Sequence, residues 1–479
     1  MELEQKLYEY FGYPSFRTGQ REVIERLLDG KDVIALLPTG MGKSLCYQLP
    51  GYLFEKPVLI VSPLLSLMQD QVDQLKQLGE KRVVALNSFL SPQQKKYALH
   101  YLQEYRFIFT SPEMLTQPQV RERLAQIEFS LIVADEAHCI SQWGFDFRPD
   151  YLRIGEVLKA NRPPILALSA TATQTVLEDI KVYLHMQEPY TFIGNVDRPN
   201  IGIAQKSFMA KEEKFEWILQ HVKNSAGPGI IYTQSRKKAE NFSRQLLEHG
   251  ILAASYHAGK EAEDRQFIQQ QFIAGDLQWI VATNAFGMGV HKNNIRQVIH
   301  ESMPANISNY MQEIGRAGRD GQDAVAILLY VEGDEHFAKY IATEDLPKSV
   351  HVDSYLRYQQ GMQNPMSMLQ AGEISETAFR VLDYWMKQEN VEAVKQRLLN
   401  MEIHKYEAVR EMMNIVVGAG CMREKIVSYF GQKLAYRPPN CCQNCGIELQ
   451  QLLAPRSEEK VEHMLAWNNR LRKLLFTDV

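Results

Sequence analysis

The chain has 479 residues, and at about 150 residues per domain this length suggests roughly three domains instead of one small module. Its composition, 45% hydrophobic and 23% charged, is close to that of an average globular protein, which excludes a disordered or fibrous chain. The 53 Lys and Arg against 57 Asp and Glu give a net charge of -4. Any nucleic acid must therefore be bound by local patches, because no general positive field attracts phosphates.

The sequence shows no run near the roughly 20 apolar residues of a membrane-spanning helix, and its first residues lack the plan of a signal peptide. We therefore expect a cytoplasmic protein with no membrane partner. Only six cysteines occur, and four of them fall between residues 421 and 445. This distribution favours a local metal site over a disulfide framework.

Short apolar runs alternate with longer amphipathic stretches in two consecutive series. The first series predicts strands at 32–37, 57–62, 106–111, 131–136 and 165–170, and the second at 229–234, 251–257, 278–284, 296–302 and 325–330. Strands that alternate with helices indicate parallel sheets, whose functional loops lie at the carboxyl ends of the strands. We therefore predict an α/β chain with two parallel-sheet domains.

The turn-forming segment GNVDRPN, residues 194–200, is the best boundary between the two series. The strand signal fades after about residue 335, and the remaining segments are mostly helical. We predict a first domain at 1–200, a second at 201–335, and a small helical region at 336–479 that carries the cysteine cluster.

A glycine-bearing turn, PTGMGKS, follows the first predicted strand. Its backbone N–H groups can surround phosphate oxygens, Lys43 would neutralise the β and γ phosphates, and the Ser44 hydroxyl would hold Mg²⁺. The strict pattern has a glycine where this chain has Leu37, and the alternative is a tight turn with a surface lysine. The residues predicted to bind the nucleotide here are Thr39, Gly40, Met41, Gly42, Lys43 and Ser44.

The predicted strand at 131–136 ends in the tetrapeptide DEAH. An acidic residue at the end of a neighbouring strand can hold magnesium through water, and a second carboxylate can orient or deprotonate the attacking water. We assign these roles to Asp135 and Glu136. The alternative is a pair of acids at an exposed helix start, and the phosphate-binding turn about 90 residues upstream argues against it.

Nine motifs occur in the order and spacing of the RecQ family of DNA helicases in superfamily two. They are PTGMGKS, SPLLSLMQDQV, TSPEML, DEAHCISQWGFDFRPDY, SATAT, IIYTQSR, YHAG, ATNAFGMGV and QEIGRAGRDG. The chain resembles this family over about residues 1–450, and it is most similar to the short RecS-type form without winged-helix and HRDC domains. The resemblance implies two tandem RecA-like domains with ATP in the cleft between them, followed by a helical, zinc-binding-like region.

The resemblance also implies an ATP-dependent 3'-to-5' DNA helicase or translocase, stimulated by DNA and acting in repair or recombination. In FGYPSFRTGQ, Gln20 would hydrogen-bond the adenine edge while Tyr13 and Arg17 stack on the ring. The alternative for this segment is the start of an amphipathic helix.

In QEIGRAGRDG, the residues assigned to hydrolysis are Gln312, Arg316 and Arg319. As in the family, Arg319 would be the finger that reaches across the cleft to the γ-phosphate. The two arginines are three positions apart, so on a helix they would share one face. The alternative is a solvated basic face.

The segment SQWGFDFRP interleaves Trp143, Phe145 and Phe147 with Arg148. Aromatic faces stack on unpaired bases at about 1–3 kcal/mol per base, and arginine adds attraction to phosphates. The resemblance identifies this segment as the loop that couples DNA binding to hydrolysis, although family members commonly have His at position 145. Hydroxyls and amides of SPLLS at 62–66 and TSPEML at 110–115 would hold the DNA backbone.

Two further motifs have weaker signals. The hydroxyls of SATAT at 169–173 would link His138 to the second domain, although such residues also form ordinary turns. In ATNAFGMGV the chain continues with His291 where the family pattern usually has Asp, so we assign no role to His291.

The cysteine cluster has metal-ligand spacing. Cys442 and Cys445 form a CxxC pair, and Cys421 lies upstream at a spacing that suits tetrahedral zinc. The family pattern continues with a cysteine where this chain has Glu448. Either Cys441 or Glu448 completes the site, or the ion is absent and the thiols are reduced and partly buried.

We expect a monomer that uses ATP, Mg²⁺ and Zn²⁺ and binds single-stranded and tailed or forked DNA, together with replication or recombination proteins. This expected DNA binding implies a nucleoid-associated protein. Two other hypotheses are an ATP-switched nucleic-acid-binding scaffold with weak turnover and an RNA remodeller with the same motor. The presence of Lys43, Glu136 and Arg319 argues against an inactive site. Phosphate release with and without single-stranded DNA, and with DNA against RNA, separates the three hypotheses.

Overall fold

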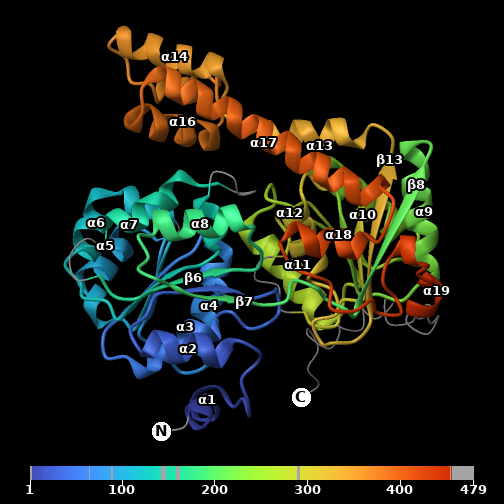
Figure 1. Cartoon of the computed structure of the whole chain (residues 1–479), viewed down its shortest axis with the longest axis horizontal. Helices are drawn as coiled ribbons and strands as arrows, with labels where there is room; N and C mark the ends of the chain where they lie inside the picture. Colours follow the sequence, from blue (N-terminus) through green and yellow to red (C-terminus); the bar gives the residue numbers. More distant parts are fainter. Residues whose placement is uncertain are drawn as a thin grey trace, which may run out of the picture.

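The computed structural model describes residues 3–63, 65–87, 90–141, 147–157, 162–287, 292–453 and 455. Figure 1 shows two α/β lobes side by side, with a group of helices above them. Within the named strands of these residues, every paired neighbour is parallel. The predicted architecture of two tandem RecA-like parallel sheets is therefore confirmed.

The first lobe contains a seven-stranded sheet in the order β3-β4-β2-β5-β6-β1-β7. Its strands are β1 (Val33–Leu36), β2 (Val58–Val61), β3 (Val83–Leu86), β4 (Phe107–Thr110), β5 (Leu131–Ala134), β6 (Ile165–Ser169) and β7 (Tyr190–Ile193). Its main helices are α1 (Leu3–Phe11), α2 (Gln20–Leu28), α3 (Leu45–Leu53), α4 (Leu65–Gln77), α5 (Pro92–His100), α6 (Pro118–Leu124), α7 (Ile154–Val157) and α8 (Gln174–Tyr183). Helices cover both faces, so the central strands are buried apolar runs.

The second lobe contains a six-stranded sheet in the order β10-β11-β9-β12-β13-β8. Its strands are β8 (Ile201–Phe208), β9 (Gly229–Tyr232), β10 (Ala253–Tyr256), β11 (Trp279–Ala282), β12 (Gln297–His300) and β13 (Ala324–Val331). Its helices are α9 (Lys211–Asn224), α10 (Arg236–Glu248), α11 (Ala262–Ala274) and α12 (Ile307–Ile314). Residues 194–200 lie between the last strand of the first sheet and the first strand of the second.

The rest of the described chain is helical. It comprises α13 (Asp334–Thr343), α14 (Ser349–Gln360), α15 (Ser367–Gln370), α16 (Glu376–Gln388), α17 (Val391–Val417), α18 (Met422–Tyr429) and α19 (Leu449–Leu452). We name α14, α15, α16 and the first half of α17 the helical arm. Figure 1 shows the arm above the first lobe, while the second half of α17 lies with α13 and α18 on the second lobe.

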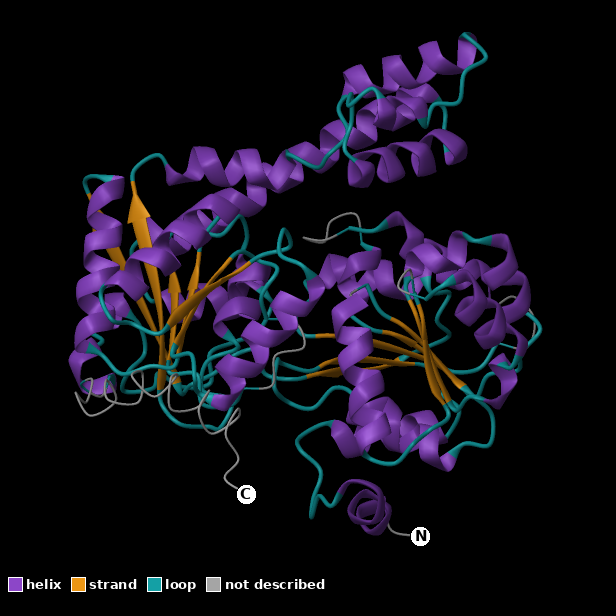
Figure 2. Cartoon of the chain, turned by 180° about the vertical axis from the view of Figure 1, so that it is seen from behind, coloured by secondary structure: helices purple, strands orange, loops and turns teal. Residues whose placement is uncertain are grey.

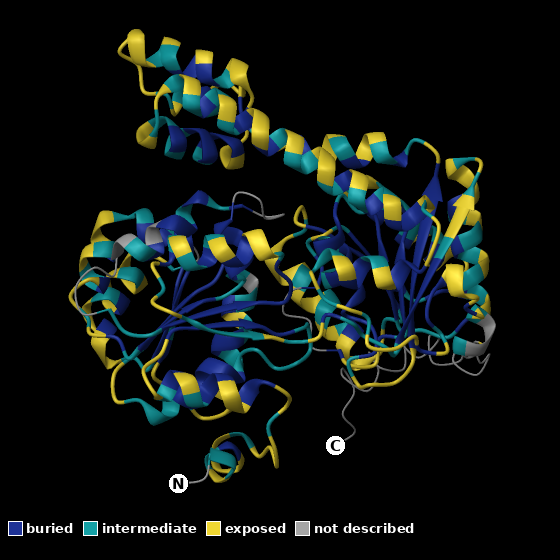
Figure 3. Cartoon of the chain, in the orientation of Figure 1, coloured by how far each residue is buried: buried dark blue, intermediate teal, exposed yellow. Residues whose placement is uncertain are grey.

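The two halves of α17 belong to different hydrophobic cores. Leu398 and Met401 pack with the core of the first lobe, whereas Val409 and Met412 pack with that of the second lobe. Figure 3 shows the alternation of buried and exposed positions along this helix. The helix therefore connects the two lobes by packing, while residues 194–200 connect them in sequence. Among the described residues, no helix is both long and apolar enough to span a bilayer.

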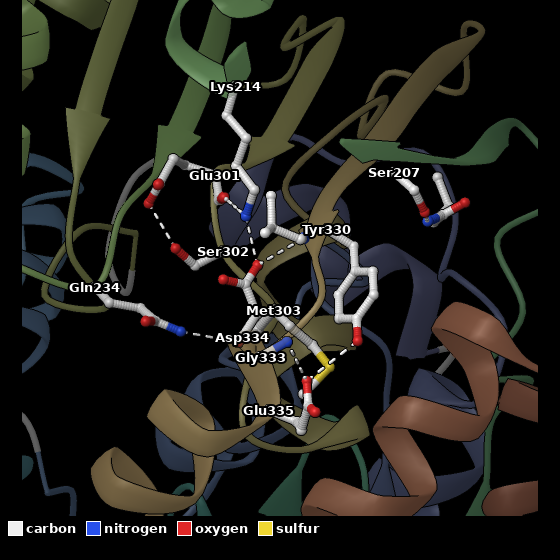
Figure 4. A network of polar contacts seen from close by, with 12 residues as sticks. Ser207, Lys214, Gln234, Glu301, Ser302, Met303, Tyr330, Gly333, Asp334 and Glu335 are labelled. Atoms are coloured by element: carbon white, nitrogen blue, oxygen red, sulfur yellow. Dashed lines mark hydrogen bonds and ion pairs between the residues drawn. The ribbon is translucent and has the colours of Figure 1, made fainter. Parts of the chain in front are cut away.

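A buried polar network fixes the start of α13 against the second sheet (Figure 4). The Lys214 side chain is 1% exposed, and its ammonium donates to the Glu301 carbonyl at 3.0 Å and pairs with the Asp334 carboxylate. The same carboxylate accepts the Val331 N–H at 3.2 Å. Because a buried ion pair with its hydrogen bonds satisfied resists displacement, this network anchors the helical region to the second lobe.

Candidate active site between the two lobes

The turn PTGMGKS, residues 38–44, connects β1 to α3. Gly40 and Gly42 have φ of 89° and 74°, a backbone region that side chains disfavour and glycine adopts freely. The first N–H groups of α3 donate to carbonyls of the turn itself, as Leu45 does to Gly42 at 3.2 Å, so the turn leads directly into the helix N-terminus, whose dipole favours phosphate. The Ser44 hydroxyl does not cap the helix. The turn therefore has the geometry expected of a phosphate-binding loop.

The two carboxylates of DEAH come close to this loop because only β6 separates β5 from β1 in the sheet. Lys43 Nζ donates to Glu136 Oε1 at 3.1 Å, with 17% and 12% of the two side chains exposed. Asp135 Oδ1 accepts the Glu136 N–H at 3.0 Å, and Asp135 Oδ2 lies 3.4 Å from the Ser62 hydroxyl. The fold thus brings together the lysine and both acids predicted from the sequence.

The charges of this group fit a divalent cation. Burial and the negative charge of Glu136 raise the pKa of Asp135. Burial also raises the pKa of Glu136, but the cationic groups of Lys43, His138 and Arg316 outweigh it and lower that pKa. Glu136 Oε2 is buried without a hydrogen-bond partner, 3.4 Å from His138 Nδ1. Glu136 Oε2 therefore has an unused acceptor position and the charge of Asp135 is only partly compensated, so the two acids could take a hydrated Mg²⁺, which supplies positive charge and hydrogen-bond donors.

Glu136 has an unusual backbone conformation. Its φ of 48° and ψ of 47° lie in the left-handed region, which costs a residue with a side chain about 1–3 kcal/mol. Next to it, His138 Nδ1 lies 3.0 Å from Ser169 Oγ, whose hydroxyl donates to Thr171 O at 2.9 Å. Because the single hydroxyl proton of Ser169 is donated to Thr171 O, the imidazole must be the donor in its contact with Ser169 Oγ. This contact of the SATAT segment lies within the first lobe, so the predicted link to the second domain is not made by Ser169.

The two arginines of QEIGRAGRDG do not lie on a helix face, contrary to our expectation. Helix α12 ends at Ile314, and Arg316 and Arg319 follow it in consecutive turns that include Gly318 at φ 55°. Both arginines nevertheless reach the seam between the lobes. A Cβ placed on Gly40 would lie 3.1 Å from Arg319 Cγ, so the Arg319 side chain lies against the phosphate-binding turn.

Arg316 is 5% exposed and packs on the backbone of Gly287, where a Cβ would lie 2.0 Å from its guanidinium carbon. It follows Gly315, where a Cβ would lie 3.3 Å from Thr39 Oγ1, and its charge contributes to the lowered pKa of Glu136. Gln312 is half-buried on α12. Lys43, Glu136, Arg316 and Arg319 therefore converge on one seam.

The seam carries excess positive charge on the second-lobe side. Burial, together with repulsion from Arg316 and Arg198, lowers the pKa of Arg319. Because guanidinium groups stay charged in proteins, the result is mutual repulsion and not loss of charge. A phosphate at the turn would relieve this repulsion through charge-assisted hydrogen bonds.

The residues predicted to bind adenine contact the phosphate-binding turn. Gln20 is 2% exposed, and its amide donates to the carbonyls of Met41 and Gly42 at 2.9 and 3.1 Å. The Arg17 guanidinium donates to the Gly40 carbonyl. Tyr13 is 55% exposed, and its ring lies parallel to that of Phe11 with the ring centroids 6.4 Å apart. Recognition of adenine by Gln20 would therefore require its amide to exchange partners.

The predicted aromatic DNA contacts are only partly described. Trp143 and Phe145, like His291, lie outside the described residues. Phe147 is 8% exposed and stacks on Trp385 of α16, with the ring centroids 6.5 Å apart. Its assignment to base stacking does not fit this position, because the arm covers the ring.

Arg148 is partly exposed. Its guanidinium donates to the Pro63 carbonyl at 3.0 Å and lies 3.4 Å from the Glu113 carboxylate. The Ser62 and Thr110 side chains are buried, whereas Pro63 and Ser111 of the same segments line the cleft between the lobes. Contacts of these segments with the DNA backbone stay a prediction.

A cleft of about 1590 Å³ runs between the lobes and beneath the arm, and His138 forms part of its wall. Its polar lining includes Ser111, Arg148 and Thr173 from the first lobe, Gln234, Arg236, Asn284 and Asn306 from the second, and Tyr384, Lys387, His404 and Lys405 from the helical region. The cleft therefore joins all three parts of the molecule and adjoins the DEAH segment.

The four C-terminal cysteines cluster at one point. Their sulfur atoms all lie within 4.8 Å of one another, and Cys421 Sγ lies 3.6 Å from Cys441 Sγ and 3.9 Å from Cys442 Sγ. Tetrahedral zinc with Zn–S bonds of about 2.3 Å places its sulfurs about 3.8 Å apart. A disulfide would require about 2.05 Å. The structure thus places Cys441, and not Glu448, in the cluster with Cys445.

The start of α18 favours a thiolate in this cluster. Burial alone raises the pKa of Cys442, but the backbone N–H groups of Met422 and Arg423 outweigh it and lower that pKa. A thiolate is the form that binds metal, so the helix N-terminus supports a metal site here.

One contact in the seam had no sequence signal. Arg198, in the segment between the sheets, donates to the Thr39 carbonyl at 3.3 Å and to the Gly318 carbonyl at 2.7 Å. It therefore joins the phosphate-binding turn to the turn with the two arginines. An arginine in a turn-forming segment predicts nothing by itself, and only its position between two domains could have suggested this contact.

Comparison with family models defines the class of this protein. The DEAD/DEAH box helicase model matches residues 17–180, and the helicase conserved C-terminal domain model matches residues 213–321. These ranges contain the phosphate-binding turn, the DEAH carboxylates and both seam arginines. The fold and site are those of a two-lobed helicase of this class.

Whole-chain relatives define the family. The chain is 41% identical over 487 residues to the probable ATP-dependent DNA helicase RecS of Bacillus subtilis, covering 98% of this chain and 97% of that protein. It is 34% identical to the ATP-dependent DNA helicase RecQ of the same organism, covering 92% of this chain and 66% of RecQ. For RecQ of Pasteurella multocida the identity is 42%, over 68% of this chain and 52% of that protein. The chain belongs to the RecQ family and matches RecS over almost its full length.

Solved structures share the fold at low identity. The DUF1998 helicase MrfA bound to DNA has a TM-score of 0.59 at 19% identity, over 71% of this chain and 52% of that chain. Helicase Lhr of Mycobacterium smegmatis bound to single-stranded DNA and AMP-PNP has a TM-score of 0.58 at 18% identity, over 87% of this chain and 57% of that chain. Dbp5 of S. cerevisiae bound to RNA has a TM-score of 0.58 at 17% identity, over 71% of this chain and 90% of that chain. These likenesses establish the fold alone.

Proposed function

We propose that this chain is an ATP-dependent DNA helicase or translocase that moves 3'-to-5' along single-stranded DNA. The observation that carries the proposal is the convergence of Lys43 and Glu136 of the first lobe with Arg316 and Arg319 of the second at one seam. The relatives that cover most of this chain are named ATP-dependent DNA helicases, which supports DNA over RNA as the substrate. A nucleotide at the seam contacts both lobes, so its hydrolysis can change how they close.

The residues at the seam divide the work of ATP hydrolysis. Lys43, which pairs with Glu136, would exchange this carboxylate for the β and γ phosphates. The exchange would free Glu136 to orient the attacking water, and Arg319 with Arg316 would stabilise the charge of the transferred phosphoryl group. Ser44 and Asp135 would hold Mg²⁺, which neutralises phosphate charge when bound.

The cleft beneath the arm supports translocation. A strand in this cleft would touch polar side chains of both lobes, including Arg148 and Arg236, which suit contacts to phosphate and sugar. Such contacts carry no base specificity. Because separating DNA costs about 1.4 kcal/mol of stacking per base-pair step, unwinding of a long tract requires the repeated lobe closure that ATP hydrolysis drives.

Strand displacement on tailed duplexes tests the function. With ATP and Mg²⁺, the chain is expected to displace the strand of a 3'-tailed duplex and to leave a 5'-tailed duplex intact. Lys43→Ala serves as the inactive control. Phosphate release should rise with single-stranded DNA and much less with RNA. Release that nucleic acid does not stimulate would favour the ATP-switched scaffold, and stimulation by RNA alone would favour the RNA remodeller.

We also propose that Cys421, Cys441, Cys442 and Cys445 hold one structural Zn²⁺, as the spacing of their sulfurs supports. Replacing Cys442 by serine removes the ligand with the lowered pKa and is expected to abolish zinc binding. Because ligand binding and folding are coupled at such sites, stability should fall by several kcal/mol, on the order of a third of the roughly 10–16 kcal/mol of isolated zinc fingers. Metal content by emission spectroscopy and thermal unfolding check this prediction, and an unchanged zinc content would contradict it.

The monomeric state, the partner proteins, the role in repair or recombination and the nucleoid association stay predictions from the sequence. The same holds for the domain limits of residues 1–200, 201–335 and 336–479.

A further inference from the structure

The linker between the lobes, residues 194–200, contains a side chain that bridges them. The Arg198 guanidinium donates to four backbone oxygens, those of Thr39 at 3.3 Å, Gly315 at 3.4 Å, Ala317 at 3.3 Å and Gly318 at 2.7 Å. The first belongs to the phosphate-binding turn and the others to the turn that carries Arg316 and Arg319. One planar side chain therefore contacts both halves of the active site.

The C-terminal helical region holds this linker from the other side. Arg423 of α18 is 1% exposed and donates to the Asp197 carboxylate at 2.5 Å, to the carbonyls of Arg198 and Cys441 at 3.0 Å each, and to the Ile201 carbonyl. Gln432 adds a second contact, because its amide donates to the Gly194 carbonyl at 3.0 Å and accepts the Val196 N–H at 3.1 Å. The linker is thus fixed at several successive residues.

These contacts couple the position of Arg423 to that of Arg198. Arg423 contacts Asp197, the backbone of Arg198 and Ile201, so a shift of the Arg423 guanidinium moves the backbone that carries the Arg198 side chain. A buried arginine with several fixed acceptors has little freedom to relax. Misplacing catalytic groups by about 1 Å can reduce a rate about 100-fold.

We infer that Asp197 and Arg423 are positioning residues for ATP hydrolysis, which act through Arg198 on the fit of the phosphate-binding turn to Arg316 and Arg319. The inference rests on the proposed ATPase activity. It gives α18 and the segment around Cys441 a role in ATP hydrolysis, because the Cys441 carbonyl is one of the acceptors of Arg423. The inference does not require the metal itself.

The test is Asp197→Asn in the full chain, a change that preserves size and removes the charge facing Arg423. The kcat of DNA-stimulated ATP hydrolysis is expected to fall about 10- to 100-fold while KM for ATP changes little, since binding contacts to the phosphates stay in place. The matched control is Arg437→Gln, which breaks the exposed ion pair with Glu424 at 2.7 Å in the same region. Its kcat should equal that of the wild type.

A double-mutant cycle separates positioning from general destabilisation. If Asp197 acts through Arg198, then Asp197→Asn combined with Arg198→Lys should lower kcat no further than the more harmful single change, because both break one relay. Additive losses, or an Asp197→Asn variant with the kcat of the Arg437→Gln control, would overturn the inference. Thermal unfolding of each variant shows whether it is folded at the assay temperature. If Asp197→Asn is not folded at that temperature, the kcat of Arg198→Lys alone tests whether Arg198 acts on ATP hydrolysis. A wild-type chain without ATPase activity would instead overturn the proposed function.

Discussion

Replacing Arg319 by alanine is expected to lower kcat for DNA-stimulated ATP hydrolysis about 10³- to 10⁵-fold, the range of arginine fingers in other phosphoryl-transfer enzymes. The side chain lies against Gly40 of the phosphate-binding turn, although it belongs to the second lobe. Burial and repulsion from Arg316 and Arg198 already oppose its charge, so the site is arranged for an anion. Steady-state phosphate release at saturating single-stranded DNA measures the effect.

Arg244→Ala is the matched control for this experiment. Arg244 lies on α10 of the same lobe and is exposed. Its guanidinium donates a hydrogen bond to the Asn241 side chain, one turn earlier in the same helix, at 2.7 Å. Its removal should leave kcat unchanged. Arg319→Lys is expected to recover little activity, because an ammonium cannot reproduce the planar set of donors. Nearly normal turnover by Arg319→Ala would contradict the role assigned to the seam.

The fold could be predicted where strands are buried on both faces. All the strands that apolar runs indicated are present, from Val33–Leu36 to Ala324–Val331. The strands that the sequence did not indicate are β3, β7 and β8, and each is at an edge of its sheet. An edge strand is less enclosed, and Tyr190–Ile193, for instance, has no fully buried residue. Its sequence therefore need not be a continuous apolar run.

The site was predictable where one motif supplies its own geometry. The turn at residues 38–44 and the acids at the end of β5 follow strands, and the carboxyl ends of parallel strands meet at one edge of the sheet. The contacts that depend on distant segments could not be read in this way. Phe147 contacts Trp385 because α16 lies over the first lobe. The sequence pattern predicted that this ring stacks on DNA bases, but the ring is buried against α16.

The arginine turn shows a different limit of prediction. A spacing of three suggested one helix face, but α12 ends at Ile314 and Gly315 allows close approach to the first lobe. A Cβ on Gly315 would lie 3.3 Å from Thr39 Oγ1. This glycine therefore serves the contact between lobes, which is a property of the assembled fold and not of local periodicity.

Replacing Lys43 by alanine is expected to reduce ATP hydrolysis to background while the fold and DNA binding persist. The ammonium contacts Glu136 at the seam and no part of the apolar core, so its loss removes phosphate binding without leaving a cavity. His138 and Arg316 remain beside the Glu136 carboxylate and limit the cost of the lost ion pair. Phosphate release, thermal unfolding and fluorescence anisotropy with labelled single-stranded DNA measure the three properties.

Lys56→Ala provides the comparison for Lys43→Ala, since it removes a lysine from the same lobe that pairs with Glu128 on the surface at 2.6 Å. Exposed pairs contribute little, so this variant should hydrolyse ATP and displace strands like the wild type. The Lys43 variant should bind tailed DNA with similar affinity and leave it paired, because strand separation needs the repeated closure of the seam. Wild-type turnover without Lys43 would show that the turn at residues 38–44 does not bind the phosphates.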